Sequence, residues 1–407
     1  MTSRSYRLLL STLLLAAASC RRAGPPAHAA QASAPPPAAM RGQLAGVRPP
    51  PPPCLGRGPT APHLLAQRAA FELDRGDHPK ALACAEEALR AAPRLVAALS
   101  SRAAALTALG RLEDARLAWA QALAVDPDDP ETLYGAADLY AARLSGERAA
   151  LELGLEYAVR GARLAQQPPR HDPELAGRLL VVAAMAENDL GATRDALAHA
   201  GQALALHGGD DPDAEYERGV ALYELCRFGE ARAALERVRA VEPDDAWTLH
   251  YLALVTERTG DGARADALER RARALAPDEL RSPVEVDRTA FEQEVRRAVA
   301  ALPDRDRRAL ADVPVEVADV PELDDLTAVD PPLSPSILGL FRGPSELEPC
   351  LPEDGARCRS IVFYRRNLTR FAKSRRELEE QVRVTLLHEL GHLHGESDDD
   401  LRARGLE

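Results

Sequence analysis

Three side chains in the last thirty residues have the types and spacing of a metal-dependent hydrolytic site. His388 and His392 are four residues apart, so on a helix both imidazoles project from one face and can bind the same metal ion. Neutral imidazoles suit Zn²⁺, and Glu389 beside them can accept a proton from a water molecule that the metal acidifies. The alternative is a chance match to the short HExxH pattern, with two solvated histidines near a helix end.

A third ligand is predicted six residues after His392. On a continuing helix, Asp398 would lie roughly 240° around the axis and about 9 Å further along it, out of reach of the metal. Gly395 can adopt the left-handed conformation that ends helices, so the chain can reverse and bring Asp398 back over the histidines. The longer pattern HExxHxxGxxD is far more specific than HExxH. It predicts one Zn²⁺ bound by His388, His392 and Asp398, with Glu389 as the catalytic base.

Two helices are predicted in this part of the chain. Val382, Leu386 and Leu390 recur at helical spacing, which predicts a helix over about Ser374–Leu393 with one face in a core. Asp287 can cap an earlier helix that runs to Pro303.

Short β-prone runs lie between these helices, at 313–320, 337–341 and 360–364. The acidic, Pro-rich segment between the first two runs is expected to cross the surface as a loop. The predicted C-terminal domain, residues 284–407, is therefore a small α+β unit.

The order ILGLFRG, IVFYRRNL and HELGHLHGESDDDL within this domain is similar to that of the small bacterial zincin-like metallopeptidase family. The resemblance implies that the first two runs are strands ahead of the active helix. It also implies that His388, His392 and Asp398 are the zinc ligands and that Glu389 is the catalytic base. The sequence departs from the larger metzincins, because its last methionine is Met185 and the methionine turn beneath the metal is absent.

Stabilisation of the transition state must come from other groups, because no tyrosine follows the histidines. The candidates are the zinc ion, backbone N–H groups at a sheet edge, His394 and Tyr364. His394 points to a different helix face from the ligands, so we interpret it as a surface residue rather than a catalytic one. The rest of the acidic run at 398–400 is interpreted as a solvated tail.

The middle of the chain repeats with a period of 34 residues. Pro93 and Pro127 are 34 residues apart, as are Pro243 and Pro277, and small residues precede these prolines at matching positions. The pattern resembles tetratricopeptide repeats, in which two antiparallel helices per unit pack through small side chains. About six units over residues 62–280 are expected to form a superhelix, so the predicted fold class is mostly α.

The resemblance also implies that the concave face of the repeats binds a protein or peptide partner. The unit that begins at residue 130 needs a few inserted residues near Ser145. Trp119, Phe228 and Trp247 are interpreted as core residues rather than ligand-facing ones. Turns are expected at Gly76, Gly110, Gly191 and Gly260.

The first 19 residues have the composition of a bacterial export signal. Two arginines precede an apolar run, Leu8–Ala18, which is shorter than the roughly 20 residues that a membrane span needs. The residues ahead of Cys20 resemble a lipoprotein cleavage box, which predicts a lipid on Cys20; the alternative is an ordinary signal peptide cut near Ala29. Residues 20–61, rich in proline and alanine, are expected to be a disordered tether. These features predict export to a bacterial cell envelope, with membrane contact only through the N-terminal lipid.

Charge and cysteine content narrow the choice of partners and compartment. A formal net charge of −12 argues against a nucleic-acid partner. In an oxidising compartment Cys350 and Cys358 are the expected disulfide, with two free thiols as the alternative. Cys84 and Cys226 lie among helical apolar positions and are interpreted as small buried residues.

Two functions fit these patterns. The first is an exported, membrane-tethered zinc metallopeptidase, in which the repeats bind protein partners or substrates and the C-terminal domain hydrolyses peptide bonds. The second is an interaction scaffold with a structural or vestigial zinc site. Structural zinc sites usually have four protein ligands, whereas three ligands beside a glutamate are typical of an open catalytic site, which favours the enzyme.

Overall fold

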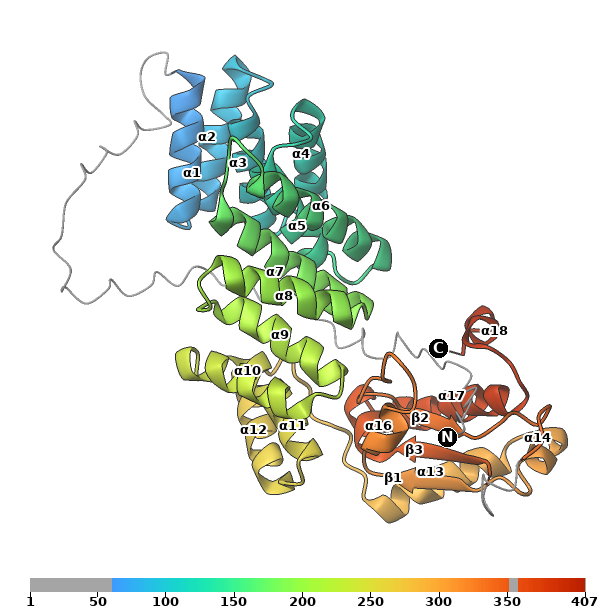
Figure 1. The fold of residues 1–407 in the computed structure, drawn as a ribbon. Coiled ribbons are helices and arrows are strands. Elements are labelled where there is room, and N and C mark those ends of the chain that lie inside the picture. The colour runs from blue at the N-terminus through green and yellow to red at the C-terminus, as the bar shows by residue number, and fades with distance from the viewer. Residues whose placement is uncertain (1–60, 351–357, 407) are drawn as a thin grey trace, which may run out of the picture. The chain divides into compact units, whose positions relative to one another are not determined.

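The computed structural model of the protein describes residues 61–350 and 358–406 (Figure 1). The predicted signal peptide, the predicted lipid site at Cys20 and all but the last residue of the predicted tether lie outside the described residues. Along the described chain, no helix is both long and apolar enough to cross a bilayer.

The chain divides into two compact units after Glu217. This division falls within a repeat helix, α9 (Pro212–Glu224). The domain boundaries inferred from the sequence therefore stay predictions.

Antiparallel helix pairs build the first unit (Figure 1). Its helices are α1 (Pro62–Asp74), α2 (His78–Ala91), α3 (Val96–Ala108), α4 (Leu112–Val125), α5 (Pro130–Asp138), α6 (Arg148–Gln166), α7 (Pro173–Leu190) and α8 (Thr193–Leu206), with a π-helical turn, η2 (Leu139–Arg143), after α5. Alanines expected at the helix contacts, such as Ala69 and Ala81, are fully buried. The turn at Gly76 has a φ of 74°, which glycine adopts without strain. The η2 turn and the loop after it contain the insertion expected near Ser145.

Three further repeat helices follow α9: α10 (Phe228–Val241), α11 (Ala246–Arg258) and α12 (Gly262–Leu275). They complete six helix pairs between residues 62 and 275 of the described chain, which confirms the mostly α repeat array. Trp119 and Trp247 are buried, as expected for core residues.

A three-stranded sheet lies at the centre of the C-terminal part. Its elements are α13 (Arg288–Ala300), α14 (Asp304–Ala309), β1 (Val315–Ala318), α15 (Leu323–Leu326), β2 (Gly339–Arg342), β3 (Ser360–Tyr364), α16 (Arg365–Phe371), α17 (Arg375–Leu393) and α18 (Asp398–Ala403). Strand β3 is central, parallel to β1 and antiparallel to β2. The small α+β fold is confirmed, although the run IVFYRRNL is a strand only as far as Tyr364, and its RRNL part opens α16.

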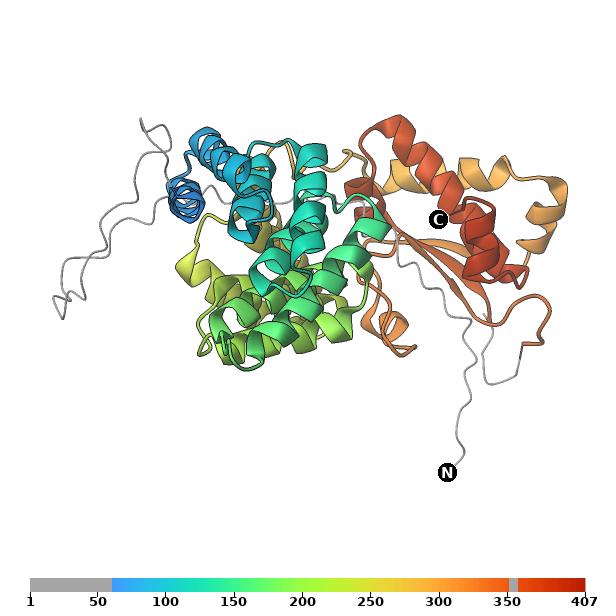
Figure 2. The ribbon, with the colours of Figure 1, turned by 90° about the horizontal axis from the view of Figure 1, so that it is seen from above.

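One face of the sheet is covered by α13 and α17 (Figure 2). Side chains alternate along a strand, so Ile361 and Phe363 of β3 share this face with Phe341 of β2. Both helices begin at a capping residue: Asp287, the predicted cap, accepts a hydrogen bond from the Ala290 backbone, and Ser374 accepts one from the Glu377 backbone.

The opposite face of the sheet packs against the repeats. Val362 and Tyr364 point to this side, together with Leu326 of α15, and Cys226 and Phe228 of the fifth repeat lie against them. Much of the acidic segment is exposed, as the sequence predicts, but Leu326 within it is fully buried and lies in the short helix α15. An apolar side chain within that segment anchors it to the sheet.

Helix α16 also contacts the last repeat pair through an ion-pair network. Arg370 donates two hydrogen bonds to the Glu257 carboxylate, at 2.8 and 2.6 Å, and the Nε of Arg366 lies 2.6 Å from the same carboxylate. The Glu257 side chain is only 6% exposed. Two guanidinium groups thus neutralise one buried carboxylate, which fixes α16 on α11.

A disulfide joins Cys350 and Cys358, the pair that the spacing suggests. Cys84 is buried as expected, but it takes part in a disulfide and is not a free thiol. Among the described residues, Cys226 is the free cysteine.

Candidate metal centre

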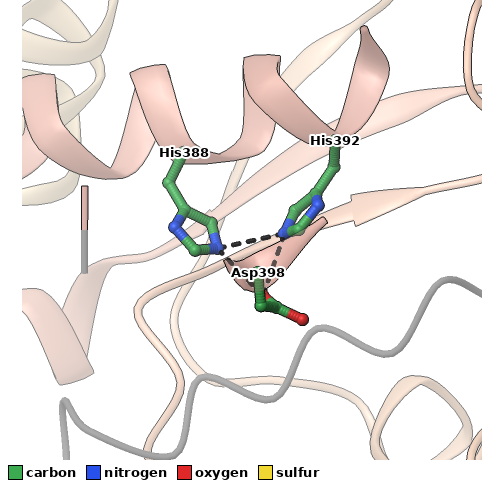
Figure 3. Close-up of side chains that lie close together, drawn as sticks. All are labelled: His388, His392 and Asp398. Carbon is green, nitrogen blue, oxygen red and sulfur yellow. Dashed lines mark hydrogen bonds and ion pairs between the residues drawn. The ribbon is translucent and has the colours of Figure 1, made fainter. Parts of the chain in front are cut away.

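Helix α17 places the two predicted histidine ligands side by side (Figure 3). The Nε2 atoms of His388 and His392 are 3.0 Å apart, and both side chains are buried. The rings are nearly perpendicular, at 81°. The four-residue spacing therefore produces the shared site expected from the helix geometry.

Asp398 returns to these rings because α17 ends where the sequence predicts. Gly395 has a φ of 86°, and the Glu396 N–H donates to the Gly391 carbonyl at 2.9 Å, which reverses the chain. The Oδ1 atom of Asp398 lies 3.5 Å from His392 Nε2 and 3.8 Å from His388 Nε2. The structure thus brings the three predicted ligands together, and their binding of zinc stays a prediction.

The tautomers of both rings are set by backbone carbonyl groups. His388 Nδ1 lies 2.6 Å from the carbonyl oxygen of Leu406, and His392 Nδ1 lies 3.0 Å from that of Glu396. A carbonyl can only accept, so each Nδ1 carries the proton. In the neutral rings, the two Nε2 lone pairs then face each other, which is unfavourable unless a proton or a cation lies between them.

The donor set, which consists of Nε2 of His388, Nε2 of His392 and Oδ1 of Asp398, fits a zinc ion. Zn–N and Zn–O bonds of about 2.0–2.2 Å in a tetrahedral arrangement put neighbouring donor atoms about 3.3–3.5 Å apart. The three separations here, 3.0, 3.5 and 3.8 Å, lie around that range. Burial alone would lower the pKa of His392, but the Asp398 carboxylate and the Glu389 charge raise it, so the site attracts positive charge. Three protein ligands leave the fourth position for water or substrate.

Glu389 is a buried carboxylate beside this donor set. It is 1% exposed, and neither carboxylate oxygen accepts a well-formed hydrogen bond among the described residues. Burial raises the pKa of Glu389, while the two histidines and the nearby Phe341 N–H act in the opposite direction. Gly339 of β2 makes room for this side chain, because a Cβ atom there would lie 3.0 Å from Glu389 Oε1. An unpartnered acid in such a place is typical of a functional group rather than a structural one.

The sequence of this region matches a known family. Residues 310–406 match the family model of zincin-like metallopeptidases. The zincin-like region begins just ahead of β1 and contains the whole donor set and Glu389.

Comparison with solved structures finds similar helical proteins. They include PilW, a widely conserved type IV pilus biogenesis factor, at 20% identity and a TM-score of 0.46, over 53% of this chain and 94% of that chain. Pseudomonas aeruginosa pilF is similar at 17% identity and a TM-score of 0.44, over 53% and 92%. A tetratricopeptide repeat protein from Parabacteroides merdae is similar at 17% identity and a TM-score of 0.40, over 53% and 78%. A search of curated proteins found no match. These similarities are too weak to bear on function.

Two other candidates in the zincin-like region lie away from the donor set. Tyr364 is on the sheet face opposite α17, and its hydroxyl lies 3.5 Å from Asp325. His394 Nδ1 lies 2.6 Å from Glu346, and its Nε2 is 3.5 Å from Asp306. Both side chains thus contact acidic residues outside the donor set, and Tyr364 also interacts electrostatically with Glu389.

Asp399 and Asp400 are exposed to solvent as predicted, but the acidic run is helical and not a tail. Asp398 to Asp400 form the first turn of α18, where Ser397 and Asp400 make a reciprocal capping box. Sequence reasoning also missed the carbonyl groups of Glu396 and Leu406, for which no side chain gives a signal.

Proposed function

We propose that the zincin-like region is a zinc metallopeptidase. The observation that carries the proposal is the convergence of two imidazoles and one returning carboxylate beside a buried, unpartnered glutamate. His388, His392 and Asp398 would hold the ion, leaving one position for a reactant.

A bound zinc ion supplies Lewis acidity, which acidifies water and polarises a carbonyl group. Glu389 has the role of general base: its carboxylate accepts the proton of the attacking water and then donates it to the nitrogen of the leaving amine. The burial that raises the pKa of Glu389 strengthens it as a proton acceptor.

The free edge of β2 is suited to hold an extended substrate. The backbone N–H of Tyr364 donates a hydrogen bond to the carbonyl oxygen of Leu338 at 2.9 Å. Between antiparallel strands, hydrogen-bonded and non-hydrogen-bonded residue pairs alternate. The backbone groups of Gly339 and Phe341 therefore point away from β3, on the side of the strand next to Glu389. A peptide strand can add to this edge, and the same N–H groups can stabilise an oxyanion.

The decisive experiment combines metal analysis with a cleavage assay. Purified wild-type protein should contain one zinc per chain, and His392→Ala should contain little. Glu389→Gln should keep its zinc but lose cleavage of unfolded proteins and of a peptide library by 10²-fold or more. Glu379→Gln removes an exposed charge from the same helix and serves as the control. Cleavage by Glu389→Gln at the control rate would refute the assigned mechanism.

A second candidate function is the scaffold with a structural or vestigial zinc site. It is favoured by the burial of the centre, since Glu389 and both histidines are almost inaccessible. This function predicts stoichiometric zinc with no turnover by the wild type and no effect of Glu389→Gln on the biological role.

We also propose that the protein is exported to a bacterial cell envelope, anchored by a lipid on Cys20, and that its repeats bind protein or peptide partners. Disulfides at Cys84 and at Cys350–Cys358 support an oxidising compartment. Fractionation of cells expressing the wild type or Cys20→Ala tests the anchor, because only the wild type should sediment with membranes.

A further inference from the structure

One segment, Glu396–Leu406, supplies three of the groups around the two histidines. Asp398 belongs to it, and so do the carbonyl groups that accept hydrogen bonds from the histidine Nδ1 atoms. The Leu406 carbonyl lies 2.6 Å from His388 Nδ1, and the Glu396 carbonyl lies 3.0 Å from His392 Nδ1. The two ends of the segment thus each hold one ring, and α18 lies between them.

An ion pair and a buried apolar side chain stabilise this segment. The side chains of Glu396 and Arg404 form an ion pair. Leu401 is fully buried and packs in the space left by Gly391, whose missing side chain lets α18 approach α17.

The last turn of the segment determines the orientation of the Leu406 carbonyl group. Gly405 has a φ of 70°, a conformation that other residues adopt only with strain. The Leu406 N–H then donates to the Leu401 carbonyl at 3.0 Å, and the Leu406 side chain is buried.

We propose that Glu396–Leu406 is a positioning clamp, whose two end carbonyls keep the proton of each histidine on Nδ1 and so keep Nε2 available for the metal. An imidazole released from its carbonyl can move its proton to Nε2, and in that tautomer it cannot bind a metal through Nε2. The metal-binding part of the inference rests on the zinc site of the proposed function. Its tautomer part concerns the metal-free protein alone.

The test uses two variants of the clamp and one matched control. The first variant ends the chain after Arg404 and removes the Leu406 carbonyl. The second, Gly405→Ala, adds a methyl group to a positive-φ residue with no atom within 4 Å of the new Cβ. Gly260→Ala makes the same change at a φ of 88° in a repeat turn, also in open space, and so controls for backbone strain.

Two quantities are measured on each protein: the zinc dissociation constant, by competition with a chelator, and the tautomer of His388 in the zinc-free protein, by ¹⁵N NMR. We expect the shortened chain to bind zinc about 10- to 100-fold more weakly and to lose the Nδ1–H form of His388. Gly405→Ala should shift both quantities in the same direction by a smaller factor, whereas Gly260→Ala should match the wild type.

Wild-type zinc affinity or an unchanged His388 tautomer in the shortened chain would overturn the clamp. If that chain does not fold, the comparison of Gly405→Ala with Gly260→Ala decides the question, and equal zinc affinities and tautomers in the two would overturn it. If the wild type itself binds no zinc, the proposed function fails, while the tautomer measurement still tests the clamp.

Discussion

Gly339→Ala should destabilise the protein by pushing β2 away from the helix that carries the metal centre. The new Cβ would lie 2.6 Å from Thr385 Cγ2 and 3.0 Å from Glu389 Oε1. Both of those side chains are buried, so neither can move into solvent. Overpacking of this kind costs about 1–3 kcal/mol, and we expect a loss of about 2 kcal/mol in the free energy of unfolding.

The closer of the two contacts can be removed separately. Thr385→Ser deletes the methyl group that lies 2.6 Å away, so Gly339→Ala with Thr385→Ser should recover most of the lost stability. The remaining contact needs Glu389 to shift by a few tenths of an ångström, so zinc binding should recover while peptidase activity stays reduced.

Urea unfolding followed by circular dichroism measures these differences. Gly262→Ala is the control, because no atom lies within 4 Å of the Cβ it adds. If Gly339→Ala is as stable as Gly262→Ala, or if Thr385→Ser restores nothing, β2 does not approach α17 as described here.

Three further predictions concern a buried ion-pair network, a buried carboxyl group and zinc binding. Glu257→Gln leaves Arg370 without its carboxylate, while Arg366 keeps its pair with Asp266, and should cost about 3 kcal/mol in urea unfolding; a loss below about 1 kcal/mol would contradict the role of the network. Burial raises the pKa of Glu224 from 4.5 to about 7, so the folded protein binds this proton more tightly than the unfolded chain, and stability should fall as pH rises from about 4.5 to 7. Glu224→Gln should therefore gain at most about 3 kcal/mol at pH 8 and nothing at pH 4; an equal gain at both pH values would exclude this cause. Free zinc at 100 times its dissociation constant should stabilise the wild type by about 2.7 kcal/mol and leave His392→Ala unchanged, as thermal unfolding would show.

The geometry of the site follows from sequence where side-chain chemistry determines it. The spacing of His388 and His392 predicts a shared helix face, and Gly395 predicts the reversal that returns Asp398. The predicted cap Asp287 marks the start of a helix for the same reason, because its side chain satisfies a backbone N–H that the helix leaves free.

Other parts of the site depend on the backbone and could not be predicted. The carbonyl of Leu406 reaches His388 whatever side chain residue 406 carries, and the space at Gly339 matters only once β2 lies beside α17. The burial of Leu326 depends on a distant sheet face, so a local acidic and Pro-rich pattern suggested a loop instead. Cys84 looked like an ordinary core residue because spacing alone does not show that a buried thiol is bonded.

The sheet face that carries Val362 and Tyr364 has a consequence for how this protein can be divided. A recombinant fragment that starts at residue 284 would lack Cys226 and Phe228 and would leave that apolar face open to water, so it should aggregate on expression. A fragment that starts at Asp211, ahead of α9, keeps Cys226 and Phe228, and this sheet face stays covered. The last repeats and the zincin-like region should for the same reason be inherited together.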